Sequence, residues 1–163
     1  MQTPSVFRQP AAFAAALFAV LALGLAAGAA PTQASGTPRL AQAADREAAS
    51  FTQCAGPARV TCVVDGDTFW YRGLKIRIAD INAPELSHPS CALEARLAVA
   101  ATQRLTDLLN AGPFTLESGV RETDRYGRAL RVVLRSGRSL GTVLEAEGLA
   151  EHWQGRRGDW CAV

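Results

Sequence analysis

Three short apolar segments, separated by turn-forming residues, constrain the fold of this chain more than any other feature. "VTCVV" at 60–64 is followed by the turn sequence "DGDT", "FWYR" at 69–72 is followed by "GL", and "KIRIADI" at 75–81 returns. Short β-prone segments joined by such turns pair as neighbouring antiparallel strands. The sequence therefore predicts a three-stranded β-meander.

A helix is predicted to follow the meander. From Ser90 onward, leucines recur at 93, 97, 105 and 108 with alanines between them, which is the spacing of one helical face. "NAGP" at 110–113 contains Asn, Gly and Pro, the residues that end helices.

Two further strands and a second helix are predicted after this point. "FTLES" at 114–118 and "RALRVVLR" at 128–135 have strand character, and Ser139 is a candidate N-cap for a short helix that ends at Glu147. Short, turn-linked strands favour a closed sheet over a doubly wound parallel one. The predicted fold class is therefore α+β, with a five-stranded OB-fold-type β-barrel and two or three helices.

The first 57 residues differ in composition from the rest. Residues 1–34 contain Arg8, then a long Ala- and Leu-rich run without charge, then small residues, which is typical of a secretory signal peptide. An uncleaved membrane anchor is the alternative, because the run is barely long enough to span a bilayer. Residues 35–57 are predicted to be a flexible linker, and residues 58–163 the folded domain. The predicted location is the periplasm or the extracellular medium.

The chain has four cysteines, Cys54, Cys62, Cys91 and Cys161. An even number in an exported protein favours disulfides, and the spacings do not form a zinc-binding pattern. Four cysteines allow three pairings, among which the sequence does not choose.

The distribution of charge is more informative than its sum. The net charge is only +2, which by itself does not indicate nucleic-acid binding. Lys75 is the sole lysine, and six arginines fall between positions 121 and 138. This density is compatible with phosphate recognition, although arginines on solvated strand edges give the same pattern.

Polar residues interrupt the third predicted strand, where "KIRIADINAPE" carries Arg77, Asp80, Asn82 and Glu85 on a stretch that otherwise reads as core. The ends of the first and third strands of a meander can approach each other, which would bring Asp67 towards Asn82. Carboxylate, amide and backbone oxygens are ligands that Ca²⁺ accepts. Because Arg77 and Asn82 are five residues apart, a regular strand would place them on opposite faces, and we expect a bend near residues 80–82.

A second arginine, Arg128, begins the strand that follows "TDRYG". Two guanidinium groups and a divalent cation can bind the non-bridging oxygens of one phosphate, since arginine pairs with phosphate bidentately. A carboxylate such as Glu85 can deprotonate an attacking water. Together these groups predict phosphodiester hydrolysis by electrostatic stabilisation.

At this point the chain resembles a known family. "VVDGDTF", "IRIADINAPE" and "TDRYGRALR", in this order, resemble the thermonuclease (staphylococcal nuclease-like) family, and "LEAEGLAEHW" resembles its final helix. The resemblance covers about residues 60 to 155. It implies an OB-type barrel with helices, a calcium cofactor, and cleavage of DNA and RNA that leaves 3′-phosphate ends.

The resemblance also implies roles for particular positions. Arg77 and Arg128 match the two phosphate-binding arginines, and Glu85 matches the general base. The implied metal ligands are Asp67, Asn82 and the backbone carbonyl of Ala83. Tyr126 matches a tyrosine that contacts substrate phosphate, and we place Arg125 beside it as a second substrate-binding residue.

One position departs from the family pattern. Asn82 stands where the family usually has a second calcium-binding aspartate, and its amide supplies no negative charge. Weaker calcium binding is therefore expected. Asp80 lies nearby but has less support as a direct ligand.

The leading hypothesis is an exported, calcium-dependent nuclease that acts as a monomer on DNA or RNA. No stable protein partner is implied, and a membrane is involved only if the N-terminal segment is not cleaved. An OB-fold nucleic-acid-binding module that no longer cuts is the first alternative, and a membrane-tethered interaction domain is the second. Retention of Arg77, Glu85 and Arg128 favours the enzyme.

Overall fold

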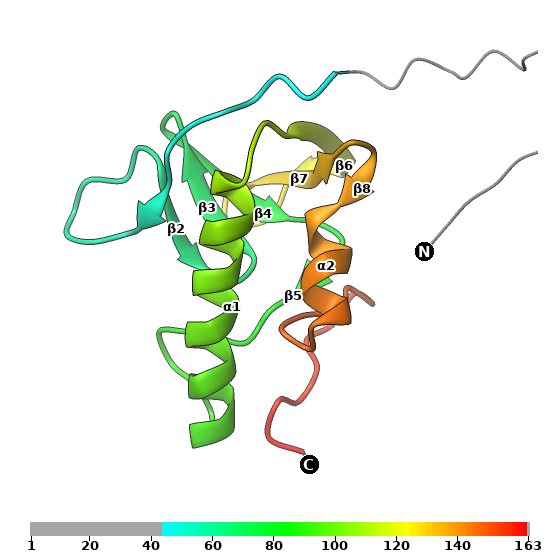
Figure 1. The fold of residues 1–163 in the computed structure, drawn as a ribbon. Helices are drawn as coiled ribbons and strands as arrows, with labels where there is room; N and C mark the ends of the chain where they lie inside the picture. The colour runs from blue at the N-terminus through cyan, green and yellow to red at the C-terminus, as the bar shows by residue number, and fades with distance from the viewer. Residues whose placement is uncertain (1–43, 163) are drawn as a thin grey trace, which may run out of the picture. The chain divides into compact units, whose positions relative to one another are not determined.

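The strands of this protein form one main sheet with a separate strand pair beside it (Figure 1). We describe residues 44–162 of a computed structural model. The N-terminal segment for which a signal peptide is predicted lies outside the described residues. The strands are β1 (Thr52–Gln53), β2 (Cys62–Asp65), β3 (Thr68–Tyr71), β4 (Leu74–Ile78), β5 (Ile81–Asn82), β6 (Thr115–Thr123), β7 (Ala129–Arg135), β8 (Arg138–Ser139) and β9 (Glu151–His152), and the helices are α1 (Ala92–Asn110) and α2 (Leu140–Ala146).

The predicted meander is present, because β2, β3 and β4 pair in antiparallel register. The main sheet then continues from β4 to β7 in parallel and from β7 to β6 in antiparallel, in the order β1-β2-β3-β4-β7-β6. Within residues 44–162 this path does not close on itself, with β1 and β6 at its ends. The α+β class is therefore confirmed, whereas the predicted closed five-stranded barrel is not seen in the strand pairing.

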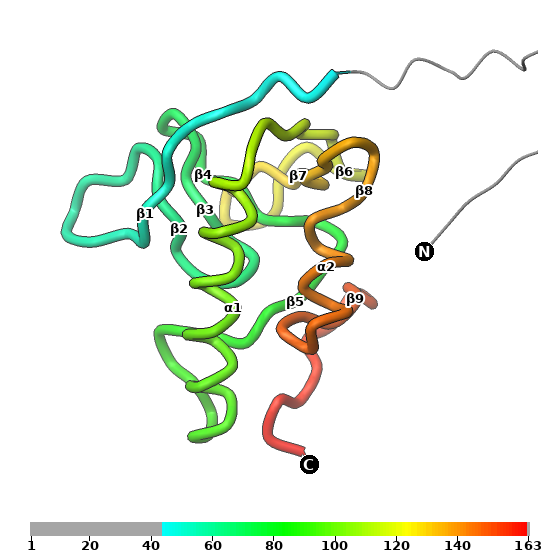
Figure 2. Tube along the Cα trace, in the orientation of Figure 1, coloured from blue at the N-terminus to red at the C-terminus, as the bar shows by residue number. Residues whose placement is uncertain are grey.

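The expected bend in the third strand lies between β4 and β5. The chain bends at Ala79 and Asp80, and β5 leaves the main sheet to pair with β9 near the C-terminus (Figure 2). This break allows the side chains on either side of it to serve one region, which a continuous strand would not permit.

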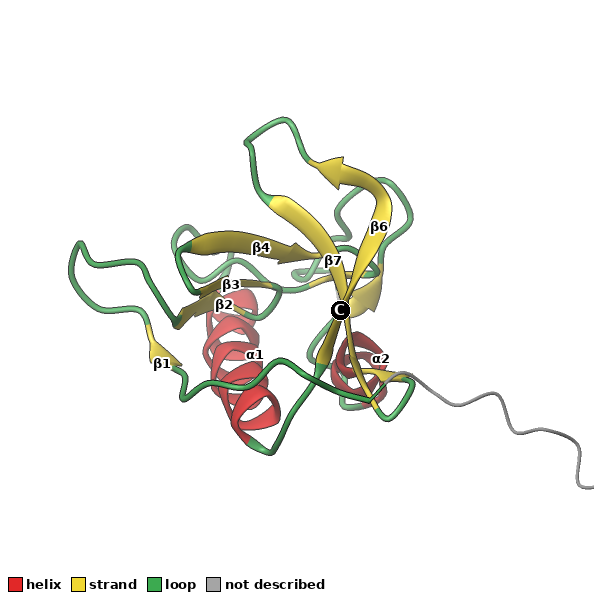
Figure 3. Cartoon of the chain, turned by 90° about the horizontal axis from the view of Figure 1, so that it is seen from above, coloured by secondary structure: helices red, strands yellow, loops and turns green. Residues whose placement is uncertain are grey.

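Both predicted helices are present, and Figure 3 shows α1 beside β2. Cys91 caps α1, and the Ser139 hydroxyl accepts a hydrogen bond from the Gly141 N–H (2.9 Å) at the start of α2. The helix α1 packs on the turn between β2 and β3. A Cβ at Gly66 would come within 2.6 Å of Ala101 Cβ, so this close approach requires glycine.

The buried core extends upstream of the predicted domain boundary at residue 58. Phe51 is only 3% exposed and stacks on Tyr71 with 6.0 Å between ring centroids. The Asn110 side chain, at the end of α1, accepts a hydrogen bond from Phe51 N–H (2.8 Å) and donates one to its carbonyl (2.9 Å). Residues 44–57, part of the stretch predicted as a linker, therefore contribute to the folded unit. Residues 35–43 lie outside the described residues.

The four cysteines form two disulfides, Cys54–Cys62 and Cys91–Cys161. The first joins β2 to the segment after β1, and the second joins the start of α1 to the C-terminal segment. In the part of the chain from residue 44 to 162, no helix is long and apolar enough to cross a membrane.

Candidate active site

A cleft of about 1040 Å³ lies beside the bend that follows β4. Its walls come from three places, namely the end of β4, the β6–β7 hairpin and the C-terminal segment after β9. In the described part of the chain its lining contains two aspartates and five arginines, which are Asp80, Asp124, Arg77, Arg121, Arg125, Arg128 and Arg157. This excess of guanidinium groups suits an anionic ligand.

Arg77 enters the cleft from β4 although only 7% of its surface is exposed. One of its guanidinium nitrogens forms an ion pair with Asp67, and Nη2 donates a hydrogen bond to the carbonyl of Ile81 (3.2 Å). The ring of Trp153 lies 5.5 Å from its guanidinium carbon, a cation–π distance. These contacts hold the Arg77 side chain in one orientation.

Arg128 lines the same cleft from the turn before β7. Its Nε forms an ion pair with Asp124 Oδ2 at 2.6 Å, and its Nη1 lies 3.4 Å from the Thr68 hydroxyl. Burial alone would raise the pKa of the Asp124 carboxyl, but hydrogen bonds from the Arg128 side chain and backbone outweigh it and lower that pKa. Asp124 is therefore ionised at neutral pH and orients Arg128.

Asp67 and Thr68 connect the two arginines. Asp67 pairs with Arg77, its Oδ1 accepts a hydrogen bond from the Thr68 hydroxyl (2.9 Å), and that hydroxyl lies within reach of Arg128. Thr68 is also the register partner of Arg77 across the β3–β4 ladder. The structure thus brings together two arginines that are 51 positions apart in the sequence.

Three residues predicted as metal ligands lie close to this pair. The backbone N–H of Ala83 donates to Asp67 Oδ2 (2.9 Å), which places the β5 end beside Asp67. The amide nitrogen of Asn82 donates to Glu151 Oε1 (2.9 Å).

A further carboxyl group, that of Asp65, lies beside Asp67. Burial, and next the adjacent Asp67 carboxylate, raise the pKa of Asp65 to about 7. Asp65 Oδ1 also accepts the Asp67 N–H (3.2 Å), the turn role that its sequence position suggests.

These donors fit a hard cation such as Ca²⁺ in kind, because the Asp65, Asp67 and Asn82 side chains and the Ala83 backbone carbonyl all offer oxygen, and the carboxyl groups of Asp65 and Asp67 repel each other. They fit it less well in charge, since Asn82 is neutral and Asp67 is already paired with Arg77. Among residues 44–162, no group of three or more Asp, Glu, His or Cys side chains is arranged to hold a metal. Asp80 is engaged elsewhere, because its Oδ2 accepts the Ser139 hydroxyl at 2.6 Å.

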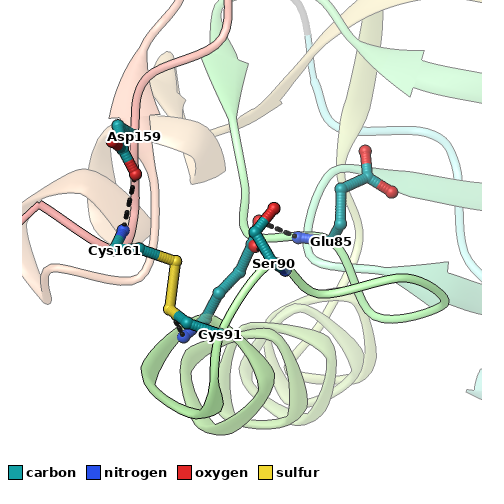
Figure 4. Close-up of a disulfide and its surroundings, with 6 residues drawn as sticks. Glu85, Ser90, Cys91, Asp159 and Cys161 are labelled. Atoms are coloured by element: carbon teal, nitrogen blue, oxygen red, sulfur yellow. Dashed lines mark hydrogen bonds between the residues drawn. A yellow bond between two sulfur atoms is a disulfide. The ribbon is translucent and has the colours of Figure 1, made fainter.

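Glu85 lies in the loop between β5 and α1 and is half-buried. Its carboxylate forms an ion pair with Arg157, and its backbone N–H donates to Glu94 Oε1 (3.2 Å) on α1 (Figure 4). Within the described residues, Glu85 does not line the cleft. Its carboxylate contacts Arg157, which does line it. Hydrogen bonds from the backbone of Ser90, and also from that of Glu85, lower the pKa of the buried Glu94.

The two predicted substrate-binding residues lie at the tip of the β6–β7 hairpin. Tyr126 is exposed and lines the cleft, and Arg125 stacks over its ring with 4.7 Å to the centroid. Arg125 Nη2 also donates to the Tyr126 hydroxyl (2.6 Å). Both side chains are accessible to a ligand in the cleft.

Sequence reasoning missed three residues of this region. Glu94 appears in the sequence only as one more polar residue of a helix, and Arg157 lies in a tail that carries no catalytic motif. Trp153 belongs to no catalytic motif in the sequence, yet it lines the cleft beside Arg77. One sequence feature could have indicated Arg157, namely that "GRRGDW" directly precedes Cys161. A disulfide from Cys161 to Cys91 holds this segment next to the start of α1.

Comparison with known families agrees with this geometry. The family model described as staphylococcal nuclease homologue matches residues 75–159, which is more than half of the chain. The protein therefore belongs to the staphylococcal nuclease homologue family. The match begins at β4 and includes both arginines of the cleft, Glu85 and the C-terminal segment, whereas the "DGDT" turn precedes it.

Proposed function

We propose that this protein is an exported nuclease that hydrolyses phosphodiester bonds of DNA, RNA or both and leaves 3′-phosphate ends. One observation carries the proposal: Arg77, from β4, and Arg128, from the turn before β7, line one cleft and are joined through Asp67 and Thr68. Fixed guanidinium groups stabilise the charge that develops on a phosphate during hydrolysis. Membership of a nuclease family supports the same reaction.

Each residue has a distinct role in the proposed reaction. Arg77 and Arg128 bind the non-bridging oxygens of the scissile phosphate, and Asp67 and Asp124 keep the two guanidinium groups in place. Glu85 accepts the proton of the attacking water. Tyr126 and Arg125, at the hairpin tip, contact substrate phosphate.

The proposed cofactor is Ca²⁺, held by the Asp67 carboxylate, the Asn82 amide oxygen and the Ala83 carbonyl. When bound there, the ion would add positive charge next to the scissile phosphate. Its affinity is expected to be low because Asn82 contributes no charge and because Arg77 competes for Asp67.

Export to the periplasm or the medium is part of the proposal. Two disulfides within a domain of this size are typical of oxidising compartments. The apolar N-terminal run in the sequence supports the same location.

Two observations favour a second candidate, a nucleic-acid-binding module without activity. The carboxylate of Glu85 is paired with Arg157, and Asn82 replaces a charged ligand. Digestion of single-stranded DNA by the purified protein, first with calcium and then with a chelator, separates the candidates. Calcium-dependent fragments with 3′-phosphate ends would support the nuclease, whereas salt-dependent binding without fragments would support the module.

A further inference from the structure

The C-terminal arm, which we define as residues 153–161, is fastened to the domain along its length. At its start, the Trp153 N–H donates to the Asp80 carbonyl (2.8 Å). At its end, Cys161 is bonded to Cys91 at the start of α1, close to the Glu85 loop (Figure 4). The arm is therefore tied to the domain at both ends, and Trp153, Gly155 and Arg157 of the arm line the cleft.

A third contact holds the middle of the arm. The Gly158 N–H donates to Glu151 Oε1, the same oxygen that accepts the Asn82 amide. A Cβ at position 158 would come to 2.1 Å from Glu151 Oε2, so only glycine allows this approach without displacement of the carboxylate. This contact determines where the neighbouring residue, Arg157, projects.

Arg157 projects into the cleft that Arg77 and Arg128 also line. Its guanidinium is paired with Glu85, yet 57% of its side chain is exposed. Exposed ion pairs contribute little free energy, so a competing anion can replace Glu85 at small cost. A phosphodiester is such an anion and matches guanidinium geometry bidentately.

We propose that Arg157 is a further substrate-binding residue, which binds a phosphate of the nucleic-acid strand next to the phosphate held by Arg77 and Arg128. The inference rests on the proposed function and adds a residue to its site. In the free protein Arg157 pairs with Glu85, and on binding it exchanges Glu85 for the substrate phosphate. The exchange leaves the Glu85 carboxylate free to accept a proton only when a strand occupies the cleft.

The salt dependence of binding tests this role, because each phosphate contact to a single strand contributes about 0.7 to the slope of log affinity against log salt concentration. The probe is a short single-stranded DNA oligonucleotide, with calcium chelated to prevent turnover. The variant is Arg157→Gln, and the matched control is Arg156→Gln. Arg156 is adjacent to Arg157 and exposed, and it is not among the residues of the described chain that line the cleft.

We expect Arg157→Gln to reduce the slope by about 0.7 and to weaken binding, while Arg156→Gln retains the wild-type slope. Arg157→Lys should retain the slope, since it keeps the charge, and an unchanged melting temperature would show that the variants are folded. A wild-type slope in Arg157→Gln, or an equal loss in both glutamine variants, would overturn the role of Arg157 alone. Absence of salt-dependent binding by the wild-type protein would instead overturn the proposed function together with this inference.

Discussion

Asp67 is the residue on which the geometry of the candidate site depends most. Its carboxylate binds Arg77, the Thr68 hydroxyl and the Ala83 N–H, and so joins β3, β4 and the end of β5. A carboxylate that accepts several hydrogen bonds at a buried position holds its partners in fixed directions. The same carboxylate is the charged member of the proposed calcium ligands, so metal binding and the orientation of Arg77 are coupled.

The first prediction concerns Glu85. Glu85→Gln should lower turnover by about 10²–10⁴-fold, because it removes the proposed base, while binding of a single-stranded oligonucleotide stays largely intact. Steady-state hydrolysis and equilibrium binding measure the two effects. Glu117→Gln is the matched control, since Glu117 is exposed on β6. Equal turnover in both variants would remove Glu85 from the mechanism.

The second prediction concerns Asn82. Asn82→Asp should tighten calcium binding by adding a charge, but it also replaces the hydrogen bond to Glu151 with a repulsion between carboxylates. Without calcium we therefore expect a loss of about 1–3 kcal/mol in the free energy of unfolding. Titration calorimetry and thermal denaturation with and without calcium measure both effects. The double variant Asn82→Asp/Glu151→Gln should recover the lost stability, and unchanged calcium affinity in Asn82→Asp would mean that residue 82 is not a ligand.

At the scale of elements, the site depends on how α1 meets the loop after β5. Glu94 in the first turn of α1 accepts hydrogen bonds from the backbone of Ser90 (2.6 Å) and Glu85 (3.2 Å). The Glu94 carboxylate therefore forms hydrogen bonds with the β5–α1 loop at two points, one near its start and one near its end. The position of Glu85 is therefore set by α1 as much as by β5, the strand that precedes its loop.

The third prediction follows from the lowered pKa of Glu94. A carboxyl whose pKa is lower in the folded protein contributes stability above its unfolded pKa of about 4.3, and this contribution is lost as the pH falls through the folded pKa. Glu94→Gln should therefore destabilise the protein by about 1–3 kcal/mol at pH 7 and by progressively less below about pH 4. Denaturant unfolding across this pH range measures the difference. A difference that is constant with pH would show that the charge of Glu94 has no part in it.

At the scale of the molecule, the two disulfides constrain very different lengths of chain. Cys54–Cys62 closes a loop of sequence separation 8, whereas Cys91–Cys161 closes one of separation 70. A longer closed loop removes more conformational entropy from the unfolded chain. The second bridge therefore stabilises the whole domain, and it also keeps the C-terminal arm beside the cleft.

The fourth prediction compares the two bridges. Replacement of Cys91 and Cys161 by serine should cost about 4 kcal/mol of unfolding free energy, against about 2.5 kcal/mol for Cys54 and Cys62. Denaturant unfolding of the two double variants measures these costs. Only loss of the Cys91–Cys161 bridge should also weaken oligonucleotide binding, because only that bridge positions Arg157. A larger binding defect in the Cys54–Cys62 variant would contradict this assignment.

Much of the fold was predictable because its signals are local. The meander follows from turn residues between short apolar segments, α1 follows from its leucine spacing, and the Ser139 cap is a short-range hydrogen bond. The pairing of β5 with β9 and the burial of Phe51 were not predictable, because each depends on a contact far away in the sequence. The expectation of a closed barrel was not met in the strand pairing for the same reason, because closure of a sheet depends on contacts between strands far apart in the sequence.

By itself, the sequence determined the chemical groups of the candidate site and the local turns that carry them. Residue identity is given directly, and the backbone preference of a turn depends only on residues that are neighbours in the sequence. It also determined the family, through ordered motifs of which all but "VVDGDTF" lie within the match at residues 75–159. Only the tertiary structure decided which cysteines pair, and that Arg157 pairs with Glu85 beside the cleft. These contacts depend on where the backbone brings distant segments together, and that is settled by packing of the whole domain.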